Sequence, residues 1–287
     1  MNQHYVPRSY LKNFAEQKGK EFFVPVYDKK ADRFFNANIK KICSEIDLYT
    51  LQEGNPITKD LLTVERMYAN SIEALYTKAY NILTNHKIHT ISLLQRTEML
   101  IGIFQLYVRN PAMLRKSISF HEKEILKGCR EARTNGHNSI KYLDEEFSFQ
   151  EWNEEAIIKF CTNKITQDFK EKHIGGVGEI GDFHQHVIFD VSVITDDSEF
   201  ITTDNPLIFE DLISDNEYPL QRSKEFTIAL NKKVAVKLYH DKTKQLNRIY
   251  RHVEPNGSVE IINKEIINRS SRFVIATKEI LDKHKIF

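Results

Sequence analysis

A five-residue segment, Thr202–Pro206 (TTDNP), places a carboxylate and an amide side by side. Asp204 and Asn205 follow the apolar pair Phe200-Ile201, which we expect to belong to a strand. Asp and Asn bond readily to their own backbone, and Pro206 keeps Asn205 out of the helical region, so a turn is favoured. A strand end can also hold polar groups precisely for binding or catalysis. The segment is therefore either a plain turn or part of a functional site.

A second pattern could bind a metal ion. Asp182, His184, His186 and Asp190 alternate at the start of a predicted strand, and alternation places all four side chains on one face. A His-x-His pair with nearby carboxylates can ligate a transition metal. The alternative is that these are surface histidines beside a loop.

A third pattern joins Arg115 and His121, which are separated by five residues on a predicted helix. This spacing resembles the short motif of a helical ribonuclease family, in which imidazole does acid–base work and guanidinium holds the phosphate. The same spacing also arises by chance, and the rest of the chain does not read as an all-helical bundle. The sequence contains no phosphate-binding loop, dinucleotide-binding glycine motif, nucleophile elbow or HExxH zinc motif.

The middle of the chain has the apolar spacing of amphipathic helices. Helices are predicted over about Leu61–Leu83, Ile91–Arg133 and Phe149–Lys172. Pro111 should end or kink the second helix near Asn110, and Asn135-Gly136 should end it. Ser148, with Glu151 three residues later, predicts a capping box at the start of the third helix. The glycines between Gly175 and Gly181 should then break the chain.

Beyond the glycines the apolar period changes to two, which predicts strands. The predicted strands are Val187–Thr195, Glu199–Thr203, Pro206–Phe209, Phe226–Leu230, Val234–Tyr239 and Phe273–Ala276, with one earlier strand at Phe22–Asp28. Pro25 should place that early strand at a sheet edge, and Asp196-Asp197 should form a hairpin turn. A last helix is predicted over about Asn263–Ser270.

This order of elements predicts an α+β fold, with an N-terminal segment and long helices followed by a mainly antiparallel sheet. The chain contains no internal repeat or low-complexity linker, so we expect one integrated domain over residues 1–287. Its helical part should span about 55–175 and its sheet part about 183–287.

Charge is segregated along the chain although its sum is close to zero. The 41 basic and 40 acidic side chains give a net charge of +1, which argues against a surface that binds phosphates everywhere. Residues 144–220 hold 4 basic and 19 acidic side chains, whereas residues 221–287 hold 15 and 7 and residues 1–41 hold 9 and 4. Either the two basic ends meet as an anion site, or the charges are solvated or face one another.

The cysteines and the apolar runs exclude several protein classes. Cys43, Cys129 and Cys161 are too few and too far apart for a disulfide scaffold or a zinc ribbon, so we expect three buried thiols. The N-terminus lacks the apolar core of a signal peptide. The longest apolar stretch, Met99–Val108, contains Gln105 and is shorter than the roughly 20 residues that a membrane span needs. A cytoplasmic protein without a membrane partner is expected.

The opening residues His4–Phe14 (HYVPRSYLKNF) are specific enough to suggest a family. They resemble H-Y-V-P-[RK]-x-Y-L-[KR]-x-F, the signature of an uncharacterised domain-of-unknown-function family of bacteria and phages. Later segments are similar to that family as well and extend the resemblance over essentially the whole chain. These are Cys43–Tyr49, the helical Glu65 and Glu73, Arg109-Asn110-Pro111, the T-[ST]-D-N-P motif at Thr202–Pro206, and Asn268 with Arg272.

The resemblance implies a set of functional positions but no reaction. It marks polar residues that packing alone would not select, and we expect them to converge on one pocket. The catalytic candidates are His4, Glu65 and Asp204, with His4 as general acid or base and the two carboxylates binding a divalent metal or orienting His4. The substrate-binding candidates are Arg109, which would hold an anionic group, together with Asn205 and Arg272.

These roles suit phosphodiester cleavage. The leading interpretation is a cytosolic nuclease or other phosphodiester-processing enzyme, and the patchy occurrence of the resembled family suggests a defence or toxin-like setting. One alternative is a non-catalytic module that binds a nucleotide, a nucleic acid or a protein. Another is a structural protein in which Arg109, Glu65 and Asp204 form a buried ion network that holds the N-terminal segment. The substrate, the metal and the oligomeric state stay open at this point.

Overall fold

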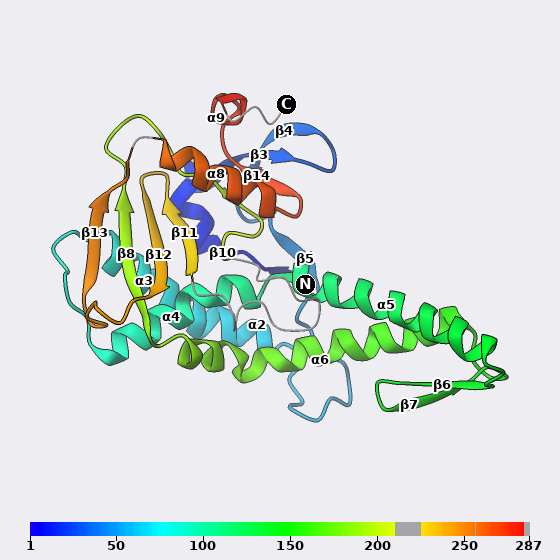
Figure 1. The fold of residues 1–287 in the computed structure, drawn as a ribbon. Helices are drawn as coiled ribbons and strands as arrows, with labels where there is room; N and C mark the ends of the chain where they lie inside the picture. The colour runs from blue at the N-terminus through cyan, green and yellow to red at the C-terminus, as the bar shows by residue number, and fades with distance from the viewer. Residues whose placement is uncertain (210–224, 256, 284–287) are drawn as a thin grey trace. The chain divides into compact units, whose positions relative to one another are not determined.

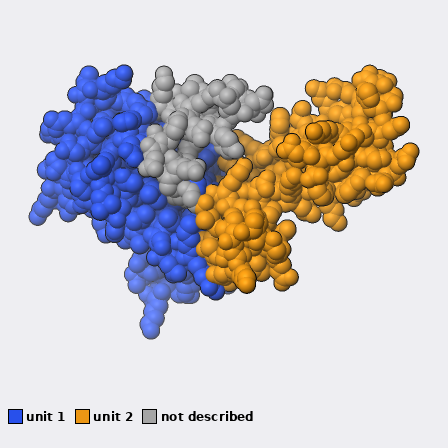
Figure 2. Space-filling view, turned by 90° about the horizontal axis from the view of Figure 1, so that it is seen from below, with its two compact units in different colours: residues 1–47, 65–109, 175–287 blue, residues 48–64, 110–174 orange. Residues whose placement is uncertain are grey.

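A computed structural model of the chain describes residues 1–209, 225–255 and 257–283, with the backbone alone at residue 175 and residues 177–183 (Figure 1). The chain divides into two compact units (Figure 2). Unit 1 comprises residues 1–47, 65–109 and 175–287, and unit 2 comprises residues 48–64 and 110–174. The expectation that residues 1–287 form one integrated domain stays a prediction. The mixture of helices with mainly antiparallel sheets confirms the α+β class.

Two helical stretches form the helical layer of unit 1. The first runs without a break through α2 (Thr63–Met67), a π-helical turn (Tyr68–Ile72) and α3 (Glu73–Thr84), and the second is α4 (Leu93–Val108). A Cβ atom added at Gly102 of α4 would lie 2.7 Å from the backbone of Leu75 and Tyr76 in α3. The helices can approach this closely only because Gly102 has no side chain.

The larger sheet of unit 1 has five strands. Their order is β10 (Ile208–Phe209), β11 (Glu225–Asn231), β12 (Val234–His240), β8 (Val187–Val193) and β13 (Ile249–Val253). All neighbours are antiparallel except β8 and β13, which are parallel. One face packs on α4, where Phe104 meets Phe226 edge-to-face at 5.0 Å, and α8 (Ser258–Arg269) lies across the other face (Figure 1).

The smaller sheet has the order β2 (Glu16–Lys18), β3 (Glu21–Asp28), β14 (Phe273–Ile275) and β9 (Thr202–Thr203), and β4 (Arg33–Asn38) pairs with the other side of β3. The edge position predicted for β3 is therefore wrong. Pro25 is tolerated because β2 pairs with residues 21–23 and β14 with residues 26–28, so Pro25 lies in the gap between them.

The N-terminal segment forms a third, two-stranded sheet in which β1 (Asn2–His4) pairs with β5 (Ser44–Ile46). It continues through α1 (Arg8–Leu11) and a short 3₁₀-helix (Lys12–Phe14). Close to the other end of the chain, α9 covers Lys278–Lys283.

Unit 2 consists chiefly of α5 (Pro111–Thr134), the first part of α6 (Glu154–Phe183) and the hairpin of β6 (Ser139–Tyr142) and β7 (Glu145–Ser148). Asn110 caps α5 and Pro111 is its first residue, which confirms the predicted break. A small core buries two of the cysteines, and its members are Ile125, Cys129, Ile140, Phe147, Ile157 and Cys161.

Three local predictions are wrong. Ser148 ends β7 opposite Ser139, and α6 begins at Glu154, where the Asn153 side chain accepts from the amide of Ala156 at 2.8 Å. Helix α6 then continues to Phe183, through the glycines that were expected to break it. The predicted Asp196-Asp197 hairpin is absent from the described residues, because β8 pairs with β12 and β13 while β9 pairs with β14. No helix among the described residues is both long and apolar enough to cross a membrane.

Candidate active site

The N-terminal segment is fixed on both sides of Tyr5. Strand β1 pairs His4 with Ser44, and the amides of Tyr5 and Val6 donate to the carbonyl of Cys43 at 3.0 and 3.4 Å. Further along, the hydroxyl of the buried Tyr10 lies 2.6 Å from that of Thr202 in β9 and donates to a carbonyl of β11. The backbone of His4 is therefore held by main-chain pairing.

Arg109, at the end of α4, ties this strand to the helices. Its side chain is only 1% exposed, and Nη1 donates to Glu73 Oε1 at 3.0 Å and to Gln105 Oε1 at 3.4 Å. Its Nη2 donates to the backbone carbonyl of His4, and the guanidinium lies over the Tyr68 ring, 4.2 Å from the centroid. These contacts engage Nη1, Nη2 and one face of the guanidinium, so Arg109 links β1 to α3 and α4.

Gln105 supports this arrangement, but the sequence analysis did not identify it as a site residue. It is fully buried, and its amide nitrogen donates to the carbonyl of Ile72 at 3.1 Å, at the last residue of the π-helical turn. π-Turns inside helices often occur at functional sites. A single glutamine inside the apolar run Met99–Val108 was the available signal, since a buried amide needs partners.

The His4 side chain is half-buried, and its Nε2 lies 3.1 Å from the carbonyl oxygen of Ile39. A carbonyl only accepts, so Nε2 carries the proton and Nδ1 keeps its lone pair. Burial lowers the pKa of His4 below its usual 6.5, with the charges of Arg8 and Arg109 adding to the effect and the Ile39 bond and Glu73 opposing it. The imidazole is therefore a neutral base near pH 7.

Glu65, in α2, lies in the same electrostatic environment. Its side chain is half-buried, and Oε2 is buried without a hydrogen-bond partner among the described residues. Burial raises the pKa of Glu65 above its usual 4.5, and Glu73 adds to this while Arg109 and Arg8 oppose it. The three charged residues that act on Glu65 are the same three that act on His4. One environment thus moves the pKa values of an acid and a base toward each other.

Asp204 and Asn205 lie apart from the residues around His4, at the junction of β9 and β14. The Asp204 carboxylate is almost fully buried and accepts from the amides of Ser271 and Arg272 at 2.9 and 2.8 Å. The side-chain amide of Asn205 donates to the carbonyl of Arg269 at 3.3 Å. Burial raises the pKa of Asp204, and these amides and that of Phe273 oppose the shift. Both side chains fasten the turn after α8.

Arg272 belongs to this second group and binds Asp28 of β3 through two nitrogens. Its Nε and Nη2 donate to the carboxylate at distances of 2.7–3.1 Å. The Asp28 side chain is 1% exposed, and the Arg272 hydrogen bonds hold its pKa below the usual value. Together with Asp204, this pair locks β14 into the smaller sheet. Asp28 was not singled out by sequence, because its partner lies 244 residues away.

The predicted site residues thus form two groups. His4, Glu65 and Arg109 lie together with Glu73, whereas Asp204, Asn205 and Arg272 surround the turn between α8 and β14. Within the part of the chain that the structure describes, no three His, Cys, Asp or Glu side chains are placed to hold a metal ion. These residues therefore do not fit the divalent-metal site considered from the sequence.

The alternation of Asp182, His184, His186 and Asp190 on one strand face is wrong, because α6 ends at Phe183 and β8 begins at Val187, so only Asp190 of the four lies in the strand. His184 packs between the rings of Phe104 and Phe226, each 4.8 Å away, and the side chain of Asp182 lies outside the described residues. In unit 2, His121 Nδ1 lies 2.7 Å from the hydroxyl of Tyr142.

Comparison with known proteins adds a family but no activity. A family model described as "Protein of unknown function (DUF4238)" matches residues 2–279, nearly the whole chain. No curated protein and no solved structure matches.

Proposed function

We propose that this chain, which belongs to the DUF4238 family of proteins of unknown function, is a hydrolase of phosphodiester bonds. The observation that carries the proposal is the unpartnered, buried carboxylate oxygen of Glu65, placed in the same charged environment as the neutral imidazole of His4. A buried carboxylate oxygen without a partner is unfavourable for folding, so a functional reason for its retention is expected.

The two side chains supply a general base and a general acid. Water attacks phosphorus and loses a proton to Nδ1 of His4, the nitrogen that the Ile39 bond leaves available. The bond from phosphorus to the leaving oxygen breaks, and that oxygen takes a proton from Glu65. Its raised pKa increases the protonated fraction available for this step. Solvent exchange then returns a proton to Glu65 and removes one from His4.

A phosphodiester carries one negative charge, and Arg8 is placed to attract it. Arg8 is exposed, and its charge acts on both His4 and Glu65. Arg109 would not need to contact the substrate, because it already holds the His4 backbone and the Glu73 carboxylate. We assign Arg109 the role of positioning α3 and α4 against β1.

For the second group, Asp204, Asn205 and Arg272, we propose a supporting role. These side chains bind the backbone and Asp28, and so they fasten β9 and β14. The structure gives them contacts that suit this role better than contact with a substrate.

Hydrolysis of bis(p-nitrophenyl) phosphate, single-stranded DNA and single-stranded RNA tests the proposal. The protein should carry its affinity tag at the C-terminus, because the Met1 ammonium lies 2.6 Å from Asp47 beside β1. The variants are Glu65→Gln and His4→Gln, and Glu98→Gln is the matched control, since Glu98 pairs on the surface with Lys78. Loss of a general acid or base should lower kcat by about 10²–10⁴-fold.

The outcomes separate the proposal from its rival. Turnover that is lost in Glu65→Gln and His4→Gln but kept in Glu98→Gln, with all three folded, supports the hydrolase. A nucleotide or oligonucleotide that raises the melting temperature without turnover would favour the non-catalytic binding module instead. Turnover that survives both site variants contradicts the assignment of the acid–base pair.

A further inference from the structure

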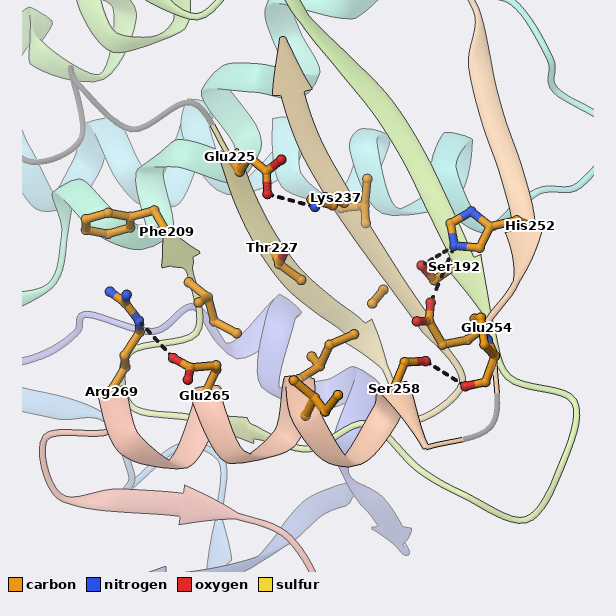
Figure 3. A pocket seen from close by; sticks show the side chains of 16 residues that line it. Ser192, Phe209, Glu225, Thr227, Lys237, His252, Glu254, Ser258, Glu265 and Arg269 are labelled. Atoms are coloured by element: carbon orange, nitrogen blue, oxygen red, sulfur yellow. Dashed lines mark hydrogen bonds and ion pairs between the residues drawn. The ribbon is translucent and has the colours of Figure 1, made fainter. Parts of the chain in front are cut away.

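A cavity of about 720 Å³ lies between the larger sheet and α8, away from the His4–Glu65 pair (Figure 3). Ser192 of β8 and His252 of β13 line it, and the two residues are direct partners in the parallel register. Asp190 precedes Ser192 by two residues and therefore points to the same face of β8. Three side chains of different chemistry thus meet on one patch of the sheet.

The three side chains form a continuous hydrogen-bonded chain. His252 Nδ1 lies 3.0 Å from Asp190 Oδ1, and Nε2 lies 3.1 Å from Ser192 Oγ. An ionised carboxylate only accepts, so Nδ1 carries the proton and Nε2 is left to accept from the serine hydroxyl. Serine hydrolases use the same relation of orienting acid, general base and nucleophile, whatever the order of the three along the chain.

The surroundings hold each member in its role. The Tyr239 hydroxyl donates to Asp190 Oδ2 at 2.9 Å, and Lys244 Nζ lies 3.5 Å from the same oxygen. Burial opposes ionisation of Asp190, but these groups and His252 keep its pKa below the usual value. Glu254 Oε2, 3.5 Å from Nε2 of His252, is placed to stabilise the imidazolium that forms when the serine loses its proton.

The cavity wall indicates the class of substrate. Its apolar members include Ile208 and Phe209 of β10 and Ile261 and Ile262 of α8. Two of its three carboxylates are paired with cations of the same wall, Glu225 with Lys237 at 2.7 Å and Glu265 with Arg269 at 3.9 Å, so the lining is nearly balanced in charge and suits an uncharged ligand. Ser192 is 6% exposed and lies at the wall, whereas the His252 side chain is 45% exposed, so a small ligand can reach both.

We propose that Ser192, His252 and Asp190 form a second catalytic site, which cleaves uncharged carboxylic esters with a short apolar acyl group. Ser192 Oγ bonds to the carbonyl carbon as its proton passes to His252 Nε2, and the carbonyl electron pair moves to oxygen. The carbon–alkoxide bond then breaks, and the alkoxide leaves as an alcohol with the proton from His252. Water repeats the sequence on the acyl-serine and releases the carboxylic acid and free Ser192.

An alkyl fluorophosphonate tests the nucleophile without any variant, because its phosphorus bonds to an activated serine oxygen and expels fluoride. Labelled wild-type protein is digested, and the modified residue is located by mass spectrometry. Modification of Ser192 is the expected result, and Ser258, which lines the same cavity but donates to the carbonyl of Pro255, is the internal control. Intact, folded protein that is unlabelled at Ser192 would overturn the proposal.

Hydrolysis of p-nitrophenyl butyrate provides the second readout. Ser192→Ala and His252→Gln should lower kcat at least about 10³-fold, whereas Ser258→Ala should stay within about twofold of wild type. Glu98→Gln, the surface control used for the phosphodiesterase, should leave ester hydrolysis unchanged. Ester hydrolysis that survives in folded Ser192→Ala would contradict the proposal.

Discussion

Replacement of Arg109 by methionine should destabilise unit 1 strongly. The substitution keeps most of the side-chain length but removes the donors to Glu73, to Gln105 and to the His4 carbonyl. Hydrogen bonds that involve a charged group contribute about 1.5–3 kcal/mol each. The bond to Gln105 is long, at 3.4 Å, so we count the bonds to Glu73 and His4, which give about 3–6 kcal/mol. This range agrees with the roughly 3–5 kcal/mol lost when one partner of a buried pair is removed. The expected fall in melting temperature is roughly 6–20 °C.

Urea unfolding measured by far-UV circular dichroism gives the free energy of unfolding of Arg109→Met. The matched control is Arg248→Met, because Arg248 is exposed and should change stability by no more than about 0.5 kcal/mol. The single tryptophan, Trp152, lies in unit 2, so its fluorescence follows that unit separately. Coincident transitions would support one integrated domain. A loss below about 1 kcal/mol in Arg109→Met would refute the positioning role.

Three further predictions concern stability. Gly102→Ala should cost about 1–3 kcal/mol in urea unfolding, because its Cβ would meet the α3 backbone at 2.7 Å. Asp28 has a depressed pKa, so its stabilisation is present above pH 3.8 and is lost as the pH falls through its folded pKa. Asp28→Asn should therefore lower stability at pH 7, with a deficit that shrinks in acid-unfolding curves. Glu65 has a raised pKa, so its folded form loses stability as the pH rises past 4.5. Glu65→Gln should gain about 1 kcal/mol at pH 7, and that gain should vanish in acid.

The sequence predicts the positions of the helices and of most expected strands better than it predicts how the strands pair. Apolar spacing found the stretch from Thr63 to Thr84, and Pro111 marked the break before α5 correctly, since both signals act within a few residues. The hairpin at Asp196-Asp197 failed because strand partners are chosen by tertiary packing. The edge position that Pro25 predicted for β3 was wrong for the same reason. A proline is tolerated inside this sheet because it lies between the ends of two strands that pair with β3.

The candidate site shows the same limit. The resemblance marked His4, Glu65 and Arg109, which the fold brings together, but it could not show that Arg109 is engaged by the backbone and Glu73. The Ser192–His252 pair was not singled out, because 60 residues separate its members and only the β8–β13 register joins them. Pairings of this kind depend on register, which no local pattern encodes.

The pH dependence of kcat/KM for bis(p-nitrophenyl) phosphate tests the acid–base pair most directly. With His4 as base and Glu65 as acid, the rising limb should lie below pH 6.5 and the falling limb above pH 4.5, because the two pKa values move toward each other. Any residual activity of Glu65→Gln should lose the falling limb and keep the rising one. A wild-type profile that is flat from pH 4 to pH 7, or a falling limb that persists in Glu65→Gln, would contradict the account.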